Sequence, residues 1–220
     1  MDWTAIALTL RLAALTTAIL VLIGLPLAYW LARTTWRWKF LIEAVVALPL
    51  VLPPTVMGFY LLMALGPRSP LGQLYEALTG RLLPFSFQGL LLASVLYSLP
   101  FAVRPFASAF AGVDWRLVEA SWCLGKSRLQ TFIRIIIPLT WAGLLTGIVL
   151  SFAHTVGEFG VVIMVGGNIP GVTRTVSVSI YDEVQALNYA AAGETALFLL
   201  GLCFVVLCVT YTLQRRVVVL

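Results

Sequence analysis

The chain has 220 residues, of which 61% are hydrophobic and only 10% are charged, and its formal net charge is +5. Soluble domains carry roughly 45–50% apolar and about 25% charged residues. A globule of this size could not bury so many apolar side chains without exposing patches larger than monomers tolerate. Composition therefore excludes a water-soluble protein and predicts that lipid surrounds most of the chain. The sequence contains no run of basic residues, so nothing in it indicates a nucleic-acid partner.

Five uncharged segments are each long enough to cross a membrane, because roughly 20 helical residues span a hydrocarbon core of about 30 Å. They are residues 12–32, 44–67, 82–103, 135–157 and 195–214. The segments are apolar on every face, whereas the strands of a membrane β-barrel alternate in polarity. We therefore predict an all-α membrane protein with a single transmembrane domain, residues 1–220. Its spans are expected at about residues 8–32, 42–65, 83–111, 132–157 and 191–213.

Lysine and arginine are distributed unevenly between the two sides that five spans define, and the cytoplasmic loops of membrane proteins carry an excess of both. Ten of the 14 basic residues fall on one side: Arg33, Arg37, Lys39, Arg104, Arg116, Lys126, Arg128, Arg134, Arg215 and Arg216. The other four are Arg11, Arg68, Arg81 and Arg174. We predict that the larger group is cytoplasmic, which places the N-terminus outside and the C-terminus inside. The first span is expected to be a permanent helix rather than a signal peptide, since no basic start precedes it.

Prolines interrupt the predicted spans. A proline inside a helix removes a backbone hydrogen bond and kinks the helix. Membrane proteins tolerate such breaks where protein or a water-filled cavity satisfies the freed carbonyl. The densest case is residues 48–58, which contain Pro49, Pro53 and Pro54. A broken helix of this kind is typical of a translocation path, and a kink that only improves packing is the alternative.

Residues 113–130 carry the signals of a helical hairpin between the third and fourth spans. Asp114 is a suitable N-cap for its first helix, and Gly125 suits the left-handed conformation that ends that helix. Ser127 and Gln130 form a capping box at the start of the second. We therefore predict two helices joined by a sharp turn on the cytoplasmic side.

The first helix of this hairpin is too short to span and places Trp115, Val118 and Trp122 at helical spacing. Exposed aromatic residues in this position indicate either a helix that docks in a partner's groove or one that lies on lipid headgroups. The residues themselves favour neither alternative.

The same hairpin resembles a family signature. Glu119, Ala120 and Ser121 are followed after three residues by Gly125, and after nine more by residues 135–138, Ile-Ile-Ile-Pro. This is similar to the Glu-Ala-Ala loop of permease subunits in binding-protein-dependent ABC importers, with serine for the second alanine and isoleucine for leucine. The resemblance implies a type I importer permease fold, whose coupling helix docks on a cytoplasmic ATPase. The residues that it implies in ATPase coupling are Trp115, Val118, Glu119, Ala120, Trp122 and Gly125.

Later segments resemble the molybdate-type branch of that family. They are residues 157–160 (Gly-Glu-Phe-Gly), 165–171 (Val-Gly-Gly-Asn-Ile-Pro-Gly) and 173–175 (Thr-Arg-Thr). Sulfate and tungstate permeases have related segments. The resemblance therefore implies molybdate as the substrate, with sulfate or thiosulfate and tungstate as alternatives and a passive anion channel as a further one.

The resemblance also implies partners and a location. It implies a homodimer in a bacterial or archaeal inner membrane, with two copies of the ATPase and an external or periplasmic molybdate-binding protein, and no cofactor. The sequence carries no Walker A motif and no catalytic constellation, so we expect a transport subunit whose partner hydrolyses ATP. Five spans do not readily enclose a polar path, which favours a path on the two-fold axis of a homodimer.

Five residues are predicted to lie on the path or at its gate: Pro53, Pro54, Glu158, Asn168 and Arg174. For Glu158 the alternative is a structural pair with Arg174 or with backbone amides. His154 is the single histidine and is expected to be a packed polar group. Residues 159–173 are too short and too interrupted to span, so we expect them to form the outer end of the fourth span or a re-entrant turn.

Overall fold

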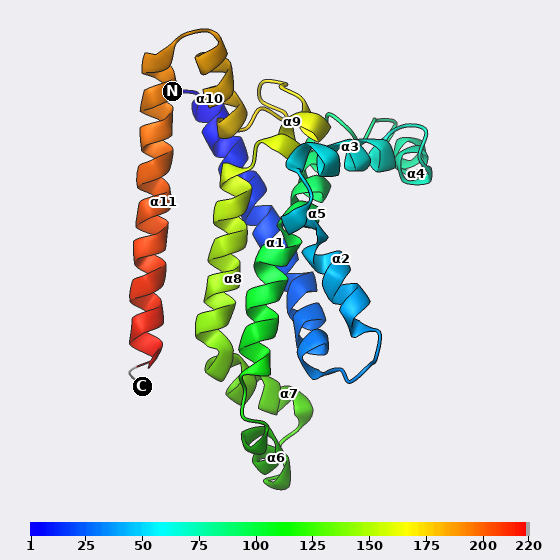
Figure 1. The fold of residues 1–220 in the computed structure, drawn as a ribbon, viewed down its shortest axis with the longest axis vertical. Helices are drawn as coiled ribbons and strands as arrows, with labels where there is room; N and C mark the ends of the chain where they lie inside the picture. The colour runs from blue at the N-terminus through cyan, green and yellow to red at the C-terminus, as the bar shows by residue number, and fades with distance from the viewer. Residues whose placement is uncertain (219–220) are drawn as a thin grey trace.

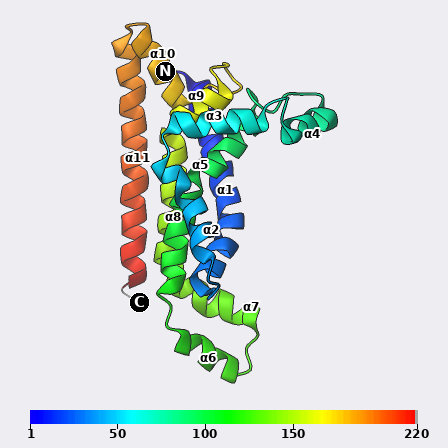
Figure 2. The same ribbon diagram turned by 45° about the vertical axis from the view of Figure 1, so that its right-hand side comes forward.

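The computed structural model describes residues 1–218, with side chains as far as residue 213, and all regular structure in this part of the chain is helical. In chain order the helices are α1 (Trp3–Arg33), α2 (Lys39–Val51), α3 (Pro54–Leu65), α4 (Pro70–Thr79), α5 (Phe87–Ala111), α6 (Trp115–Cys123), α7 (Arg128–Thr131), a π-helix (Phe132–Ile136), α8 (Ile137–Gly157), α9 (Gly160–Gly166), α10 (Val176–Gln185) and α11 (Tyr189–Val218). Figures 1 and 2 show their arrangement.

Four helical segments are long and apolar enough to cross a membrane: α1, α5, α11, and the continuous run from α7 through α8. The pair of α2 and α3, which is bent by 115°, makes a fifth if its halves count as one span. The prediction of an all-α membrane protein with about five spans is therefore confirmed. The second predicted span, residues 42–65, does not cross in a straight line, because the chain turns sharply after Val51.

Local capping sets the starts of two spans. α1 begins at Trp3 rather than at residue 8, because the Asp2 carboxylate accepts a hydrogen bond from the Ala5 amide at 3.0 Å. α5 begins at Phe87 rather than at residue 83, because the Ser86 hydroxyl accepts one from the Gly89 amide at 3.1 Å. The predicted domain extends to residue 220, but residues 219–220 and the side chains of Arg215 and Arg216 lie outside the described part.

The core lies where α1, α5 and α8 pack together, around the fully buried side chains of Leu20, Val103 and Phe106. Small residues let α8 approach α5 closely, as is common between membrane helices. A Cβ atom added at Gly147 would lie 2.5 Å from Phe106 Cε1, and one added at Gly143 would lie 2.5 Å from the Ala109 Cβ. These two glycines therefore fix how near the two spans can come.

The remaining elements divide between two ends of this core (Figure 1). The hairpin of α6 and α7 projects beyond the spans at one end, and the N-terminus, α9 and α10 lie at the other. α11 runs along the edge of the bundle and contacts α8 and α10. Its apolar side chains are largely exposed along its length, as expected for a helix that faces lipid.

Candidate functional site: the helical hairpin and the broken helices

The hairpin has the caps that its sequence predicts. The Asp114 carboxylate accepts a hydrogen bond from the Arg116 amide at 3.0 Å and so begins α6. Gly125 ends that helix in the left-handed region, with φ of 75° and open space around its Cα. A reciprocal capping box joins Ser127 and Gln130 at the start of α7. The backbone, rather than packing, therefore requires glycine at the turn.

One face of α6 is turned toward the membrane helices. Val118 is 0% exposed and lies in the core cluster with Phe110 and Ile136. The Ser121 hydroxyl forms a buried hydrogen bond of 2.9 Å with the Thr131 hydroxyl, which joins α6 to α7. Helical spacing grouped Val118 with Trp115 and Trp122, and in the structure the bundle itself covers Val118.

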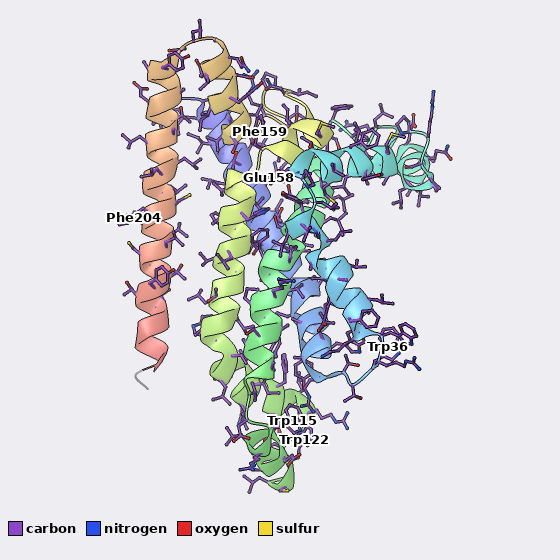
Figure 3. The ribbon with its side chains drawn as sticks, in the orientation of Figure 1. Trp36, Trp115, Trp122, Glu158, Phe159 and Phe204 are labelled. Atoms are coloured by element: carbon purple, nitrogen blue, oxygen red, sulfur yellow. The ribbon has the colours of Figure 1, made fainter. Side chains whose placement is uncertain are left out.

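Trp115, labelled in Figure 3, contacts the end of α1. Its ring is half-buried, and the guanidinium carbon of Arg33, the last residue of α1, lies 3.2 Å from the ring centroid. Its other neighbour is the Trp122 ring, in an edge-to-face contact at 5.8 Å. Trp115 therefore connects the outer part of α6 to the end of α1.

The other face of α6 and the turn are open. Trp122 is 39% exposed and Leu124 is 79% exposed. The further exposed residues of this outer face are Leu117, Glu119, Ala120 and Cys123. Within the described part of the chain, Glu119 has no ion pair and no side-chain hydrogen bond. The outer face thus combines exposed apolar side chains, which include an aromatic ring of the kind enriched at protein interfaces, with an unpaired carboxylate.

The second helix of the hairpin continues into the fourth span through the π-helix Phe132–Ile136. Pro138, two residues after its end, has no amide hydrogen to donate to the Arg134 carbonyl. The Ile137 amide instead bonds the Phe132 carbonyl, five residues back. The hairpin and α8 are therefore continuous, with a local change of helical register between them.

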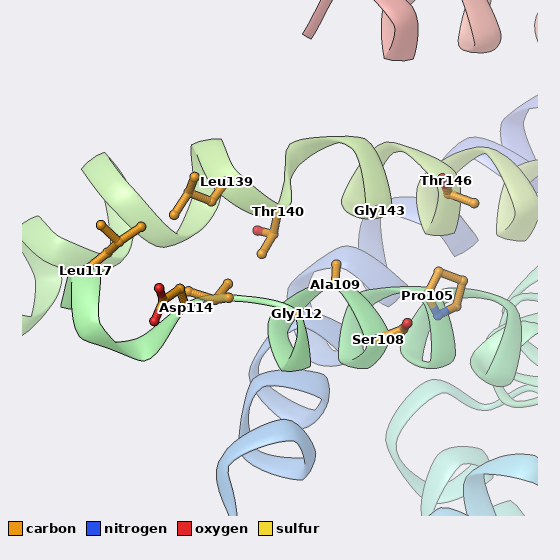
Figure 4. A pocket seen from close by; sticks show the side chains of 11 residues that line it. Pro105, Ser108, Ala109, Gly112, Asp114, Leu117, Leu139, Thr140, Gly143 and Thr146 are labelled. Atoms are coloured by element: carbon orange, nitrogen blue, oxygen red, sulfur yellow. The ribbon is translucent and has the colours of Figure 1, made fainter. Parts of the chain in front are cut away.

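A groove of 640 Å³ lies at the base of the hairpin (Figure 4). It is bounded by Ser108 and Ala109 of α5, by Asp114 and Leu117 at the start of α6, and by α8. The groove separates the start of α6 from α8, so the hairpin is supported on one side and open on the other.

The second span breaks at two consecutive prolines. Leu52 and Pro53 are extended, with ψ of 136° and 138°, and Pro54 is the first residue of α3. A proline disfavours the α conformation in the residue before it, so two in succession end one helix and start another. Both prolines are exposed in the isolated chain.

Glycines bring α9 against this break. A Cβ added at Gly160 would lie 2.5 Å from the Pro54 Cβ, and one added at Gly58 would lie 2.7 Å from the Met164 Cβ. Residues 159–173 therefore do not extend the fourth span. They form the separate helix α9, packed on α3 and α5, and a following loop.

Glu158 occupies the break between α8 and α9 (Figure 3) and is 7% exposed. Its Oε1 atom accepts a hydrogen bond of 2.8 Å from the Val161 amide, and its Oε2 atom lies 4.0 Å from His154 Nε2. The carboxylate is thus paired with a backbone amide, one of the two structural alternatives predicted from the sequence. The alternative pairing of Glu158 with Arg174 is wrong.

His154 is a packed polar group, as expected. Its ring stacks on Phe101 with centroids 3.8 Å apart, and Nδ1 lies 3.0 Å from the Ser98 hydroxyl. Ser98 also shares a hydrogen bond of 3.0 Å with Thr155. These contacts join α5 to the end of α8, next to Glu158.

Asn168 and Arg174 form a cluster with Asp182, which the sequence analysis did not identify. Arg174 Nε donates to the Asn168 carbonyl oxygen, and the Asn168 amide donates to Asp182 Oδ2, both at 2.6 Å. Arg174 Nη2 lies 3.5 Å from the same carboxylate oxygen. The cluster fixes the loop after α9 to α10 at the end opposite the hairpin. The only feature of the sequence that could have predicted this cluster is an acidic residue, Asp182, on the helix after Arg174.

The predicted path residues therefore lie in two places. Pro53, Pro54 and Glu158 belong to adjoining helix breaks, whereas Asn168 and Arg174 lie in the loop before α10, where they contact Asp182. No group of three or more His, Cys, Asp or Glu residues that could hold a metal occurs in the described part of the chain.

Comparison with known proteins identifies the family. The sequence profile described as "Binding-protein-dependent transport system inner membrane component" matches residues 24–219. The chain belongs to this family. An inner membrane component is expected to have apolar spans such as those found here. The family description also agrees with the resemblance that the hairpin residues carry.

Curated relatives of this transport component match over nearly its full length. The "Molybdenum transport system permease protein ModB" of Azotobacter vinelandii is 52% identical, over 97% of this chain and 95% of that protein. The protein of the same name from Escherichia coli (strain K12) is 35% identical, over 97% of this chain and 94% of that protein. A "Probable sulfate transport system permease protein cysT" of Prototheca wickerhamii is 31% identical, over 96% and 82%.

Two solved structures share the fold of this transport component. A chain of a bacterial alginate ABC transporter, solved with an alginate-bound periplasmic protein, aligns with a TM-score of 0.78 and 17% identity over 97% of this chain and 78% of its own. A chain of the MetNI methionine ABC transporter, in an inward-facing conformation, aligns with a TM-score of 0.73 and 16% identity over 97% and 94%. The predicted importer permease fold is therefore confirmed.

The turn at Gly125 generates the first prediction. A non-glycine residue in the left-handed region costs roughly 1–2 kcal/mol, so Gly125→Ala should speed hydrogen exchange of the α6 amides by about 5- to 30-fold. Gly125→Asn should have a smaller effect, because asparagine tolerates this conformation. Exchange mass spectrometry of peptides from residues 113–130 measures both.

The matched control is Gly112→Ala, just before the hairpin. Gly112 has a φ of −78°, and its added Cβ would meet no atom closer than 3.6 Å. Exchange at α6 that is equally fast in the wild type and in Gly125→Ala would contradict the prediction.

Proposed function

We propose that this chain is the membrane-spanning permease subunit of an ATP-driven importer of molybdate, and that a separate subunit hydrolyses the ATP. The capped hairpin carries the proposal, because it projects beyond the spans with an exposed apolar face that the chain itself does not cover. The 52% identity to a molybdenum transport permease over nearly the whole chain supports molybdate as the substrate. Sulfate is the second candidate, because the chain is also 31% identical to a probable sulfate permease.

In this proposal the homodimer binds two copies of a cytoplasmic ABC ATPase, one at the outer face of α6 in each chain. Glu119, Ala120 and Trp122 contact the ATPase, because they lie on that face. Val118 and Trp115 act from the inner face, where they attach the helix to the bundle. Gly125 holds the turn that sets the angle between α6 and α7.

The translocation path lies between two copies of the chain. The described spans surround a core filled by side chains such as Leu20 and Phe106, which supports a path on the two-fold axis of a homodimer. The breaks at Pro53–Pro54 and Glu158 adjoin each other and form the moving part of the gate. An external binding protein delivers the anion at the end that carries Asn168 and Arg174.

The hairpin is cytoplasmic, the N-terminus is outside and the C-terminus is inside, in a bacterial or archaeal inner membrane. The excess of lysine and arginine at the hairpin end supports this orientation. The N-terminus lies at the end opposite the hairpin (Figure 1), which agrees with it.

ATP-dependent uptake into liposomes tests the proposal. We expect the permease, its ATPase and its binding protein together to import molybdate faster than sulfate, and to import neither without ATP. Equal uptake with and without ATP would indicate a passive channel. Faster uptake of sulfate than of molybdate would replace the proposed substrate and leave the transporter intact.

Replacement of Trp122 tests the docking face. A tryptophan at the centre of an interface typically contributes 2 kcal/mol or more, so Trp122→Glu should lower the amount of anion imported per ATP hydrolysed by at least about 30-fold. The control is Trp36→Glu, which changes a tryptophan of similar exposure, 48%, outside the hairpin. Unchanged import per ATP in Trp122→Glu would exclude this face as the coupling surface.

Cys123 tests the orientation, because its thiol is exposed on α6. A membrane-impermeant maleimide should label it in inside-out vesicles stripped of peripheral subunits, and not in intact spheroplasts. Cys123→Ser should abolish the signal, which excludes labelling of Cys203 and Cys208 in α11. Labelling of Cys123 in intact spheroplasts would reverse the proposed orientation.

A further inference from the structure

Four side chains form a continuous stack from α1 to α7, which we name the Arg–Trp stack: Arg33, Trp115, Trp122 and Arg128. Arg33 lies on the Trp115 ring at 3.2 Å, the two indole rings meet edge to face at 5.8 Å, and the Arg128 guanidinium carbon lies 5.9 Å from the Trp122 ring centroid. Planar guanidinium groups stack on aromatic faces through cation–π attraction. The stack therefore links the end of α1 to both helices of the hairpin.

The same face of α1 contacts the bundle one turn earlier. Tyr29 meets Phe110 of α5 and Phe132 of the π-helix in edge-to-face contacts at 5.4 and 5.3 Å. Tyr29 and Arg33 are four residues apart and so share a helix face. Beside them a groove of 750 Å³ separates α1 from the hairpin. The stack is thus a side-chain connection next to an unfilled space rather than part of close helix packing.

At its other end α1 is joined to α10. The buried Thr9 hydroxyl accepts a hydrogen bond of 2.8 Å from the Val176 amide, the first of α10. α1 is continuous between the two contacts, and at 1.5 Å per residue they lie roughly 36 Å apart along its axis. α10 carries Asp182, which bonds Asn168 in the loop after α9. One helix therefore connects the hairpin with the cluster at the opposite end.

We propose that Arg33 is a positioning residue that clamps the hairpin to α1, so that α1 follows the hairpin and carries its movement to α10. The inference rests on the proposed function, in which an ATPase moves the hairpin. α5 and α8 follow the hairpin because the chain joins them to it. The chain does not join α1 directly to the hairpin, so the end of α1 follows it through side-chain contacts, at Tyr29 and at Arg33.

Arg37 provides a matched control. Its guanidinium carbon lies 4.8 Å from the ring centroid of Trp38, the adjacent residue, and this cation–π contact stays within the loop between α1 and α2. Arg37 thus shares with Arg33 its charge, its end of the molecule and its aromatic partner type. It does not share the connection to α6.

The experiment compares variants of the complete transporter in liposomes, with anion uptake and ATP hydrolysis measured together. R33Q should lower the anion imported per ATP by about two- to fivefold, the range expected for an exposed cation–π contact, whereas R37Q should match the wild type. R33K should be intermediate, since it keeps the charge and loses the planar stack. Co-purification of the ATPase and the thermal midpoint should stay unchanged in all three.

A double-mutant cycle separates the clamp from a general loss of structure. R33Q should have little further effect in a W115L background, and W115F should behave nearly as the wild type. Equal import per ATP in R33Q and the wild type, or additive effects of R33Q and W115L, would overturn the clamp and leave the proposed function standing. A wild-type transporter without ATP-dependent uptake would instead overturn the proposed function.

Discussion

In lipid, every backbone amide and carbonyl needs a partner within the protein, and this requirement decides where the chain can bend. Pro100 and Pro105 sit inside α5 without ending it, so each frees a carbonyl in a helix that continues. Pro53 and Pro54 differ because they are consecutive, and together they exclude helix from Leu52 and Pro53. The sharp turn of the second span follows from adjacency rather than from the number of prolines.

The two helix breaks are coupled by contact. Glu158 satisfies the Val161 amide at the start of α9 with its carboxylate, so a side chain replaces the bonds that a continuous helix would supply. Gly160 then brings α9 against Pro54 without room for a Cβ. Neither break can open far without displacing the other. The polar contacts of His154 extend this unit to α5.

The caps of the hairpin were predicted correctly from the sequence, whereas the caps at Asp2 and Ser86 and most tertiary contacts were not. The caps at Asp114, Gly125 and Ser127 depend on a few neighbouring backbone groups, so the sequence suffices to predict them. The inward position of Val118 depends on which face of α6 the bundle covers, and helical periodicity carries no such information. The contact of Arg33 with Trp115 joins residues far apart in the chain. Asp182 was missed for a different reason, since its partners come from a loop that has no regular pattern.

The attachments of the hairpin differ in strength, and the difference bears on how movement is shared. Burial of a valine side chain stabilises by roughly 1.5–3 kcal/mol, and Val118 is fully buried against the core. The exposed cation–π contact of Arg33 with Trp115 contributes only about 0.5–1 kcal/mol. Under load the contact with α1 should therefore yield before the attachment at Val118. The contact at Arg33 therefore sets how closely the end of α1 follows the hairpin, whereas the chain itself joins α5 and α8 to it.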